Sequence, residues 1–124
     1  MKLGLTCDRV LALDGDMKNS TFSQEYGKAF PGRHIECFVA EQNMVGVAMG
    51  CAARGRAITF SSTFAAFFTR TFDHLRMAAV SQTSANFCGS HCGVSIGKLL
   101  LIEQNLFQRF DEPLFWGCDG AAWV

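Results

Sequence analysis

The stretch IECFVAEQNMVGVAMGCAA, from Ile35 to Ala53, joins a strand-like apolar segment to a helix-like one and places Glu41 between them. Residues 35–40 form a short apolar run typical of a buried strand. From Gln42 to Arg54 apolar residues recur at helical spacing, and Gly55 is a suitable residue to end a helix. A carboxylate at such a junction is partly withdrawn from water, which is costly unless it serves a purpose.

Further strands and helices are expected on both sides of this junction. Val10–Asp14 is a continuous apolar run that ends in an acid, which is typical of a strand buried on both faces of a parallel sheet. The other predicted elements are a helix capped by Ser20 or Thr21 and ended by Pro31–Gly32, a strand over residues 56–62, a helix from Phe64 to about Ala79 capped by Ser62 or Thr63, and a strand that begins near Asn86.

The alternation of strands and helices predicts the α/β class, with a doubly wound parallel sheet. In such sheets ligands bind beyond the carboxyl ends of the strands. Polar residues follow the predicted strands at four places, which are Asp14–Gly15–Asp16 with Ser20, Glu41–Gln42–Asn43, Ser61–Ser62, and Ser90–His91. These are the candidate site residues that the pattern alone provides.

The composition narrows the class of partner. The chain has 124 residues, 49% of them apolar, with 11 basic and 11 acidic residues, so no basic face for nucleic acid or membrane is expected. The longest apolar run, from Val45 to Ala53, is far shorter than the ~20 residues that span a bilayer. We expect an intracellular, soluble protein whose partner is a small molecule or another protein.

The six cysteines do not predict a disulfide framework. They are scattered through apolar surroundings without a secretory segment before them, which favours free, mostly buried thiols. Cys88 and Cys92 flank a Gly-Ser-His segment that resembles half of a zinc site, but no second half follows. No metal site is predicted in this chain.

Four motifs carry a family resemblance and occur in the family's order. LALDGD with KNSTFS, then ECFVAEQNM, then STFAAFFTR with FDHLRMAA, and then CGSHCGVSIG resemble the pyrimidine-binding domain of transketolases of the animal and transketolase-like type. The resemblance covers residues 2–97 and implies an incomplete thiamine-diphosphate-binding fold, because the diphosphate-binding domain that precedes it in the family is missing. We expect a partial pyrimidine-binding domain over residues 1–97 and a divergent tail over residues 98–124, disordered or out of frame.

The resemblance also implies a function. Transketolases transfer a two-carbon ketol unit between sugar phosphates of the pentose phosphate pathway, with thiamine diphosphate as the cofactor. In the family a glutamate at the position of Glu41 donates a hydrogen bond or a proton to N1′ of the aminopyrimidine ring. Judged on spacing alone, a cap or a charge that complements the helix dipole is the favoured role for Glu41, and only the resemblance reverses that preference.

Other residues receive roles in the same way. Phe67, with Phe64 one turn earlier, corresponds to the aromatic side chains that contact the aminopyrimidine, and Ser20 and His91 correspond to residues that contact the sugar phosphate. Without the resemblance the two phenylalanines are ordinary core residues, Ser20 is a cap, and His91 is a loop residue. Leu99 stands where the family has an acidic residue that recognises the donor's hydroxyl, and a leucine cannot accept that hydrogen bond.

The missing domain limits what this chain can do alone. In the family a divalent metal, Mg or Ca, and the diphosphate are bound by that domain, and the active site forms between two subunits of a cytoplasmic homodimer. We expect a chain that is inactive by itself. The alternative is a non-catalytic interaction fragment that binds a full-length transketolase subunit. The β subunits of keto-acid dehydrogenases and the deoxyxylulose phosphate synthases share the domain layout but do not normally carry these motifs together.

Overall fold

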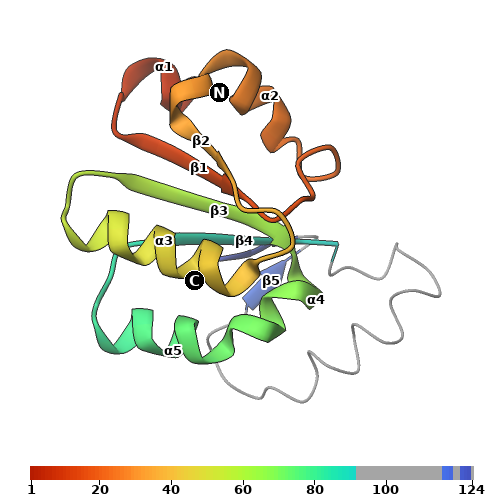
Figure 1. Ribbon diagram of the computed structural model, residues 1–124, viewed down its shortest axis with the longest axis vertical. Coiled ribbons are helices and arrows are strands. Elements are labelled where there is room, and N and C mark those ends of the chain that lie inside the picture. The colour runs from red at the N-terminus through yellow and green to blue at the C-terminus, as the bar shows by residue number, and fades with distance from the viewer. Residues whose placement is uncertain (92–115, 119–120, 124) are drawn as a thin grey trace.

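A computed structural model describes residues 1–91, 116–118 and 121–123, and these form one sheet with helices on both faces (Figure 1). The order of the described strands is β2-β1-β3-β4-β6-β5. The strands β1 to β4 are parallel, whereas β6 is antiparallel to both β4 and β5. Their bounds are β1 Val10–Asp14, β2 His34–Glu36, β3 Ile58–Phe64, β4 Asn86–Ser90, β5 Trp116–Cys118 and β6 Ala121–Trp123.

The helices divide between the two faces of the sheet, so the predicted doubly wound α/β fold is confirmed. The helices α1 and α2 lie against one face, and α3 and α5 lie against the other (Figure 1). The helical elements are α1 Lys2–Thr6, α2 Ser23–Ala29, η1 Pro31–Arg33, α3 Glu41–Ala53, α4 Ala65–Phe68, η2 Thr69–Thr71 and α5 Phe72–Val80, where η marks a 3₁₀ helix.

The core consists of two clusters, one on each face of the sheet. The larger cluster lies between the sheet and the helices α3 and α5, and its main members are Leu13, Met44, Val45, Phe68, Leu75 and Phe87. The smaller cluster lies under α2 and contains Val10, Ala12 and Tyr26. Full burial of one such side chain is worth ~1.5–3 kcal/mol, so these clusters hold the strand ends in place.

Three predicted element boundaries were wrong. The strand predicted over 35–40 is β2, which ends at Glu36, because Phe38 has a φ of 52° and turns the chain. The helix that Ser20 or Thr21 was expected to cap begins only at Ser23, after Phe22 in a left-handed conformation with a φ of 61°. The strand predicted over 56–62 lies two residues later, at Ile58–Phe64.

The single helix predicted from Phe64 to about Ala79 is divided into α4, η2 and α5. The hydroxyl of Thr69 donates to the carbonyl of Ala66 at 2.6 Å, and the hydroxyl of Thr71 donates to that of Phe68 at 2.7 Å. Such bonds compete with helical hydrogen bonding and tighten the turn. Phe72, the first residue of α5, is 37% exposed.

The described part of the chain also bears on membrane crossing, on the state of the cysteines and on the edge of the sheet. None of its helices is both long and apolar enough to cross a membrane. Cys7, Cys37 and Cys51 are free thiols, half-buried rather than buried. The edge of β4 is paired with β6, which belongs to the tail. The predictions for Leu99 and for most of residues 98–124 lie outside the described residues, and the division at residue 97 stays a prediction.

Candidate functional site

The chain reverses its direction of winding between β1 and β3, which are neighbours in the sheet. From β1 it passes to β2 on one side, and it then crosses back to β3 on the other. Asp14, the last residue of β1, pairs in register with Ser62, and β3 continues two residues further to Phe64. Ligands of doubly wound sheets bind at such a switch point, beyond the carboxyl ends of the strands.

Glu41 is the first residue of α3, and it is buried although it carries a charge. The left-handed turn at Phe38 ends β2, and the helix then starts with the amide of Met44 donating to the carbonyl of Ala40 at 2.9 Å. The residue at the N-cap is Ala40, whose side chain makes no capping bond, so Glu41 is not the cap. Its negative charge does complement the helix dipole.

The partner of Glu41 is Arg70, from the η2 turn. An Nη1 atom of Arg70 lies 3.0 Å from Oε2 of Glu41, with Glu41 3% and Arg70 58% exposed at the side chain. The neighbouring Gln42 donates from Nε2 to the backbone carbonyl of Arg70 at 2.9 Å. Arg70 is thus largely exposed but ends in an ion pair with a buried carboxylate.

The aromatic side chains gather where β3 runs into α4. Phe64 and Phe67 stack with their ring centroids 5.5 Å apart and an interplanar angle of 18°. The ring of His91, which follows β4, lies 4.2 Å from that of Phe64. All three side chains are half-buried, whereas Phe68 is only 2% exposed and packs in the core. Phe64 and Phe67 therefore form an aromatic surface at the sheet edge.

His91 has a left-handed backbone with a φ of 59°, which is uncommon for a residue other than glycine. Its Nδ1 atom lies 2.8 Å from the hydroxyl oxygen of Ser90, the last residue of β4. This contact and the Phe64 ring fix the orientation of the imidazole. His91 is thus held at the same edge as the aromatic surface.

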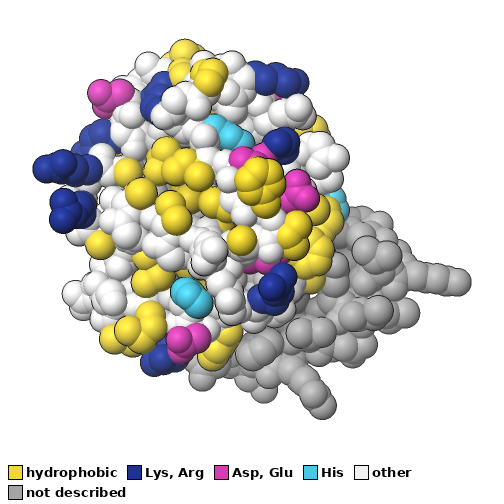
Figure 2. Space-filling model, viewed as in Figure 1, with side chains coloured by type: hydrophobic (Ala, Val, Ile, Leu, Met, Phe, Trp, Pro, Cys, Tyr) yellow, Lys and Arg dark blue, Asp and Glu magenta, His cyan; other side chains and the backbone are white. Residues whose placement is uncertain are grey.

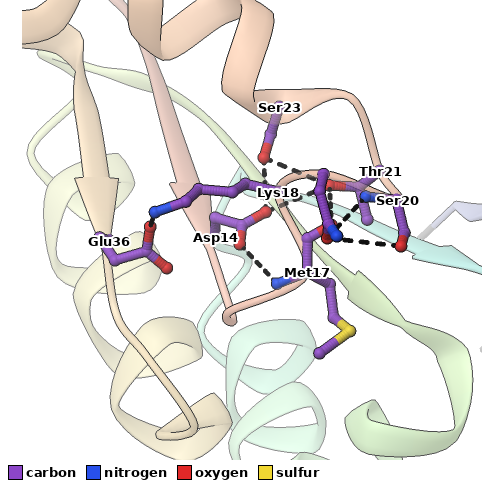
Figure 3. A network of polar contacts seen from close by, with 8 residues as sticks. Asp14, Met17, Lys18, Ser20, Thr21, Ser23 and Glu36 are labelled. Carbon is purple, nitrogen blue, oxygen red and sulfur yellow. Dashed lines mark hydrogen bonds and ion pairs between the residues drawn. The ribbon is translucent and has the colours of Figure 1, made fainter.

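Asp14 organises the loop that follows β1 (Figure 3). Its carboxylate is fully buried and accepts a hydrogen bond from the amide of Met17 at 2.8 Å. The hydroxyls of Thr21, at 3.1 Å, and of Ser23 also donate to it. Hydrogen bonds to a charged group are worth ~1.5–3 kcal/mol each, so Asp14 holds the loop that carries Ser20.

Ser20 lies in this loop and not at the start of a helix. Its amide donates to the carbonyl of Met17 and to the side-chain oxygen of Asn19, both at 2.9 Å. The nearby Lys18 forms an ion pair with Glu36, and that carboxylate raises the pKa of Lys18 (Figure 3). The loop is therefore tied to both β1 and β2.

Cys37 lies between these charged groups, directly after β2. Its amide donates to the carbonyl of Asp14 at 2.8 Å. Burial raises the pKa of the Cys37 thiol, and the negative charges of Glu36 and Asp14 raise it further. The thiol is therefore predominantly protonated at neutral pH.

The structure brings together most of the residues that the sequence singled out. Phe64, Phe67 and His91 are in contact, and Glu41 is bonded to Arg70, three residues after Phe67. Ser20 lies at the same edge of the sheet, after β1. Ser61 and Ser62 were wrongly placed at a strand end, because β3 continues beyond them.

Two features were missed, and the sequence held a signal for only one of them. Arg70 follows Phe67 at a spacing of three, which puts both side chains on one face of a helical turn. That spacing was a usable signal that Arg70 lies beside Phe67, but it did not point to Glu41 as its partner. The bonds from Thr21 and Ser23 to Asp14 depend on the loop conformation, which no periodic pattern reveals.

The stacked rings and the buried carboxylate are suited to bind one part of a cofactor. A half-buried pair of stacked rings and a buried carboxylate at one edge fit a flat, nitrogen-containing ring. Among residues 1–91 and the two short strands of the tail, no group of three His, Cys, Asp or Glu residues could hold a metal ion. The fit therefore concerns a flat aromatic ring.

Two pockets lie outside this group of residues. One, of about 520 Å³, lies at the opposite, amino-terminal edge of the sheet, and its lining includes Arg9, Ile58 and Asn86. The other, of about 260 Å³, lies between the sheet and the first two helices, lined in part by Phe22, Tyr26 and Phe60.

Apolar side chains are exposed on the face of the molecule that carries α3 (Figure 2). Phe38 is 67% and Val39 is 63% exposed just before α3, and Val47 is 40% exposed within it. Exposed apolar patches of this kind mark places where another molecule binds.

Comparison with known proteins identifies the family. The family model of the transketolase pyrimidine-binding domain matches residues 1–102. Human transketolase is 64% identical over 127 aligned positions, which cover 98% of this chain and 20% of that protein. Mouse transketolase-like protein 2 is 66% identical over 97 positions, or 78% of this chain and 16% of that protein.

A solved structure agrees with the sequence relatives. A split-gene transketolase, described as an inactive β4 tetramer, is 34% identical with a TM-score of 0.64, covering 73% of this chain and 30% of that one. The chain spans only 16–20% of the length of the curated relatives named above. It belongs to the transketolase family and contains a pyrimidine-binding domain of that family.

Proposed function

We propose that this chain supplies the pyrimidine-binding half of a transketolase active site, in which Glu41 activates the aminopyrimidine of thiamine diphosphate. One observation carries the proposal: a buried carboxylate at the start of α3 is linked through Arg70 to the η2 turn, which directly follows the stacked rings of Phe64 and Phe67. A carboxyl group and a ring surface are the two groups needed to hold and polarise an aminopyrimidine.

Each side chain has a separate task in this proposal. Phe67, with Phe64 behind it, holds the flat face of the ring by offset stacking, worth ~0.5–1.5 kcal/mol beyond area burial. The carboxyl of Glu41 shares a proton with N1′ of the ring. Thiamine diphosphate supplies a nucleophilic thiazolium carbon, which no side chain of the protein offers.

The remaining components follow from the family and are proposals for this chain. Sugar phosphates are the substrates for ketol transfer, and Ser20 and His91 contact their phosphate end. A divalent metal, Mg or Ca, and the diphosphate are held by a separate diphosphate-binding domain, as in the family. A second transketolase subunit completes the site, in the cytoplasm.

A chimeric enzyme tests this function. In human transketolase, the segment that matches this chain's residues 1–97 is replaced by those residues, and ketol transfer between sugar phosphates is measured. We expect turnover, and a fall in kcat of at least ~100-fold in the chimera with Glu41→Gln. Glu25→Gln is the control, because Glu25 is exposed and, among the described residues, forms an ion pair only with Lys28, three positions along α2. Near-normal turnover with Glu41→Gln would exclude the proposed role.

The second candidate is a non-catalytic fragment that binds a transketolase subunit. Two observations favour it: the exposed apolar side chains around α3, and a solved relative described as an inactive β4 tetramer. Light scattering of the purified chain, alone and with purified human transketolase, tests this candidate. A stable complex with transketolase, together with no ketol transfer by the chain alone, supports it, and a chain that stays monomeric in both samples excludes it.

A further inference from the structure

We propose that Arg70 is an exchangeable partner of Glu41, which neutralises the buried carboxylate in the free chain and leaves it when an aminopyrimidine ring binds. The inference rests on the proposed function and adds to it a residue that acts through Glu41. Arg70 is thus a positioning residue. Its guanidinium and the ring compete for one carboxyl group.

The two sides of the ion pair differ sharply in burial. The side chain of Glu41 is 3% exposed, whereas that of Arg70 is 58% exposed. A buried carboxylate left without a partner is strongly destabilising, so Glu41 needs a partner whenever the site is empty. A largely exposed guanidinium can return to water at little cost. Of the two residues, only Arg70 is free to leave.

The backbone of Arg70 is fixed, so the exchange involves only its side chain. The carbonyl of Arg70 accepts a hydrogen bond from Gln42 at 2.9 Å. On either side, the hydroxyls of Thr69 and Thr71 donate to carbonyls of the preceding turn. The guanidinium can therefore swing outward while the η2 turn and the preceding α4, which carries Phe67, remain in place.

The chemistry of the two partners explains why they exclude each other. A guanidinium only donates hydrogen bonds, and it pairs with an ionised carboxylate, which has no proton to give. The N1′ atom of an aminopyrimidine is an acceptor and needs a proton from the carboxyl group. The carboxyl group of Glu41 cannot be ionised for the guanidinium and carry a proton for N1′ at the same time. Binding of the ring therefore displaces the guanidinium.

Thiamine binding to the full 124-residue chain tests the exchange, because thiamine carries the aminopyrimidine without the diphosphate. Its affinity is measured by ligand-observed NMR titration, and urea unfolding is followed in parallel. Arg70→Met is expected to bind thiamine about 3- to 10-fold more tightly than the unmodified chain while unfolding at lower urea. Arg70→Gln is a second variant that also removes the charge, and it should bind more tightly as well.

Three matched variants separate this effect from a general change in the fold. Arg76→Met removes another exposed arginine, which pairs with Asp73, and should leave the affinity unchanged. Arg70→Lys keeps the positive charge and should return the affinity to near its original value. In the background of Glu41→Gln, Arg70→Met should have no further effect on thiamine binding, because the two changes act on one interaction.

The outcomes distinguish this inference from the function it rests on. Tighter binding by both neutral variants, with the controls unchanged, supports the exchange. If the unmodified chain binds thiamine but Arg70→Met and Arg70→Gln bind it equally or more weakly, the exchange is wrong and the proposed function stands. If neither the unmodified chain nor any variant binds thiamine, both are wrong.

Discussion

The ring of His91 lies 4.2 Å from the ring of Phe64, although the two residues are 27 positions apart in the chain. The contact follows from the sheet, because Phe64 and Ser90 are paired in register at the ends of β3 and β4. A parallel pairing of two strands thus brings an aromatic residue and a histidine to one edge.

This contact can be tested in solution by the NMR signals of the histidine rings. Replacing Phe64 with Leu removes the ring current on His91, so the Hε1 resonance of His91 should move. The signals of His34 and His74, on β2 and α5, serve as internal controls and should stay in place. Loss of the aromatic contacts should lower the free energy of unfolding by ~0.5–1.5 kcal/mol. An unchanged His91 signal would show that the two rings are apart.

Asp14 is predicted to be the main support of the loop between β1 and α2. Asp14→Asn removes the charge to which three groups donate and should lower the free energy of unfolding by ~1–3 kcal/mol, measured by urea denaturation. Asp16→Asn is the control, because Asp16 is exposed and Asn tolerates its left-handed backbone with a φ of 63°. Equal losses from the two variants would contradict the role given to Asp14.

Two glycines should respond in opposite ways to alanine. A Cβ atom at Gly89 would lie 2.9 Å from Cα of Ala65, where backbone blocks it, so Gly89→Ala should destabilise the fold by ~1–3 kcal/mol. At Gly50, within α3, a Cβ atom meets nothing within 4 Å, so alanine should stabilise the helix by ~0.5–1 kcal/mol. Thermal unfolding of both variants decides the matter, and a stable Gly89→Ala protein would refute the close approach of α4 to β4.

The raised pKa of Cys37 predicts slow alkylation. Because the thiolate is the reactive form, iodoacetamide should modify Cys37 slowly at pH 7, and the rate should rise only above the usual thiol range. Removing one nearby charge with Glu36→Gln should lower that pKa and speed the reaction, but only in part, since burial is the larger cause. The rate at Cys37 is followed by peptide mass spectrometry over a range of pH. Rapid modification at neutral pH would contradict the predicted pKa shift.

The sequence predicted the layers of the fold well and the local geometry less well. The strand Val10–Asp14 and the helix α3 were predicted nearly residue for residue, because their apolar periods are strong. The divided helix after β3 was missed, since the hydroxyls of Thr69 and Thr71 act through local bonds that leave no mark on the apolar period.

The candidate site shows the same contrast. Glu41 and Phe67 were singled out through the motifs that contain them. The pairing of Glu41 with Arg70 was not predicted, because it depends on how η2 lies against the start of α3. Contacts between segments far apart in sequence require the tertiary structure.

The central claim is that Glu41 and the surface formed by Phe64 and Phe67 bind an aminopyrimidine ring. The most direct test is a crystal structure of the chain grown with thiamine. The account predicts the ring stacked against Phe67, with N1′ within hydrogen-bonding distance of a carboxyl oxygen of Glu41. A ring bound at the amino-terminal edge beside Arg9, or one bound without contact to Glu41, would contradict it.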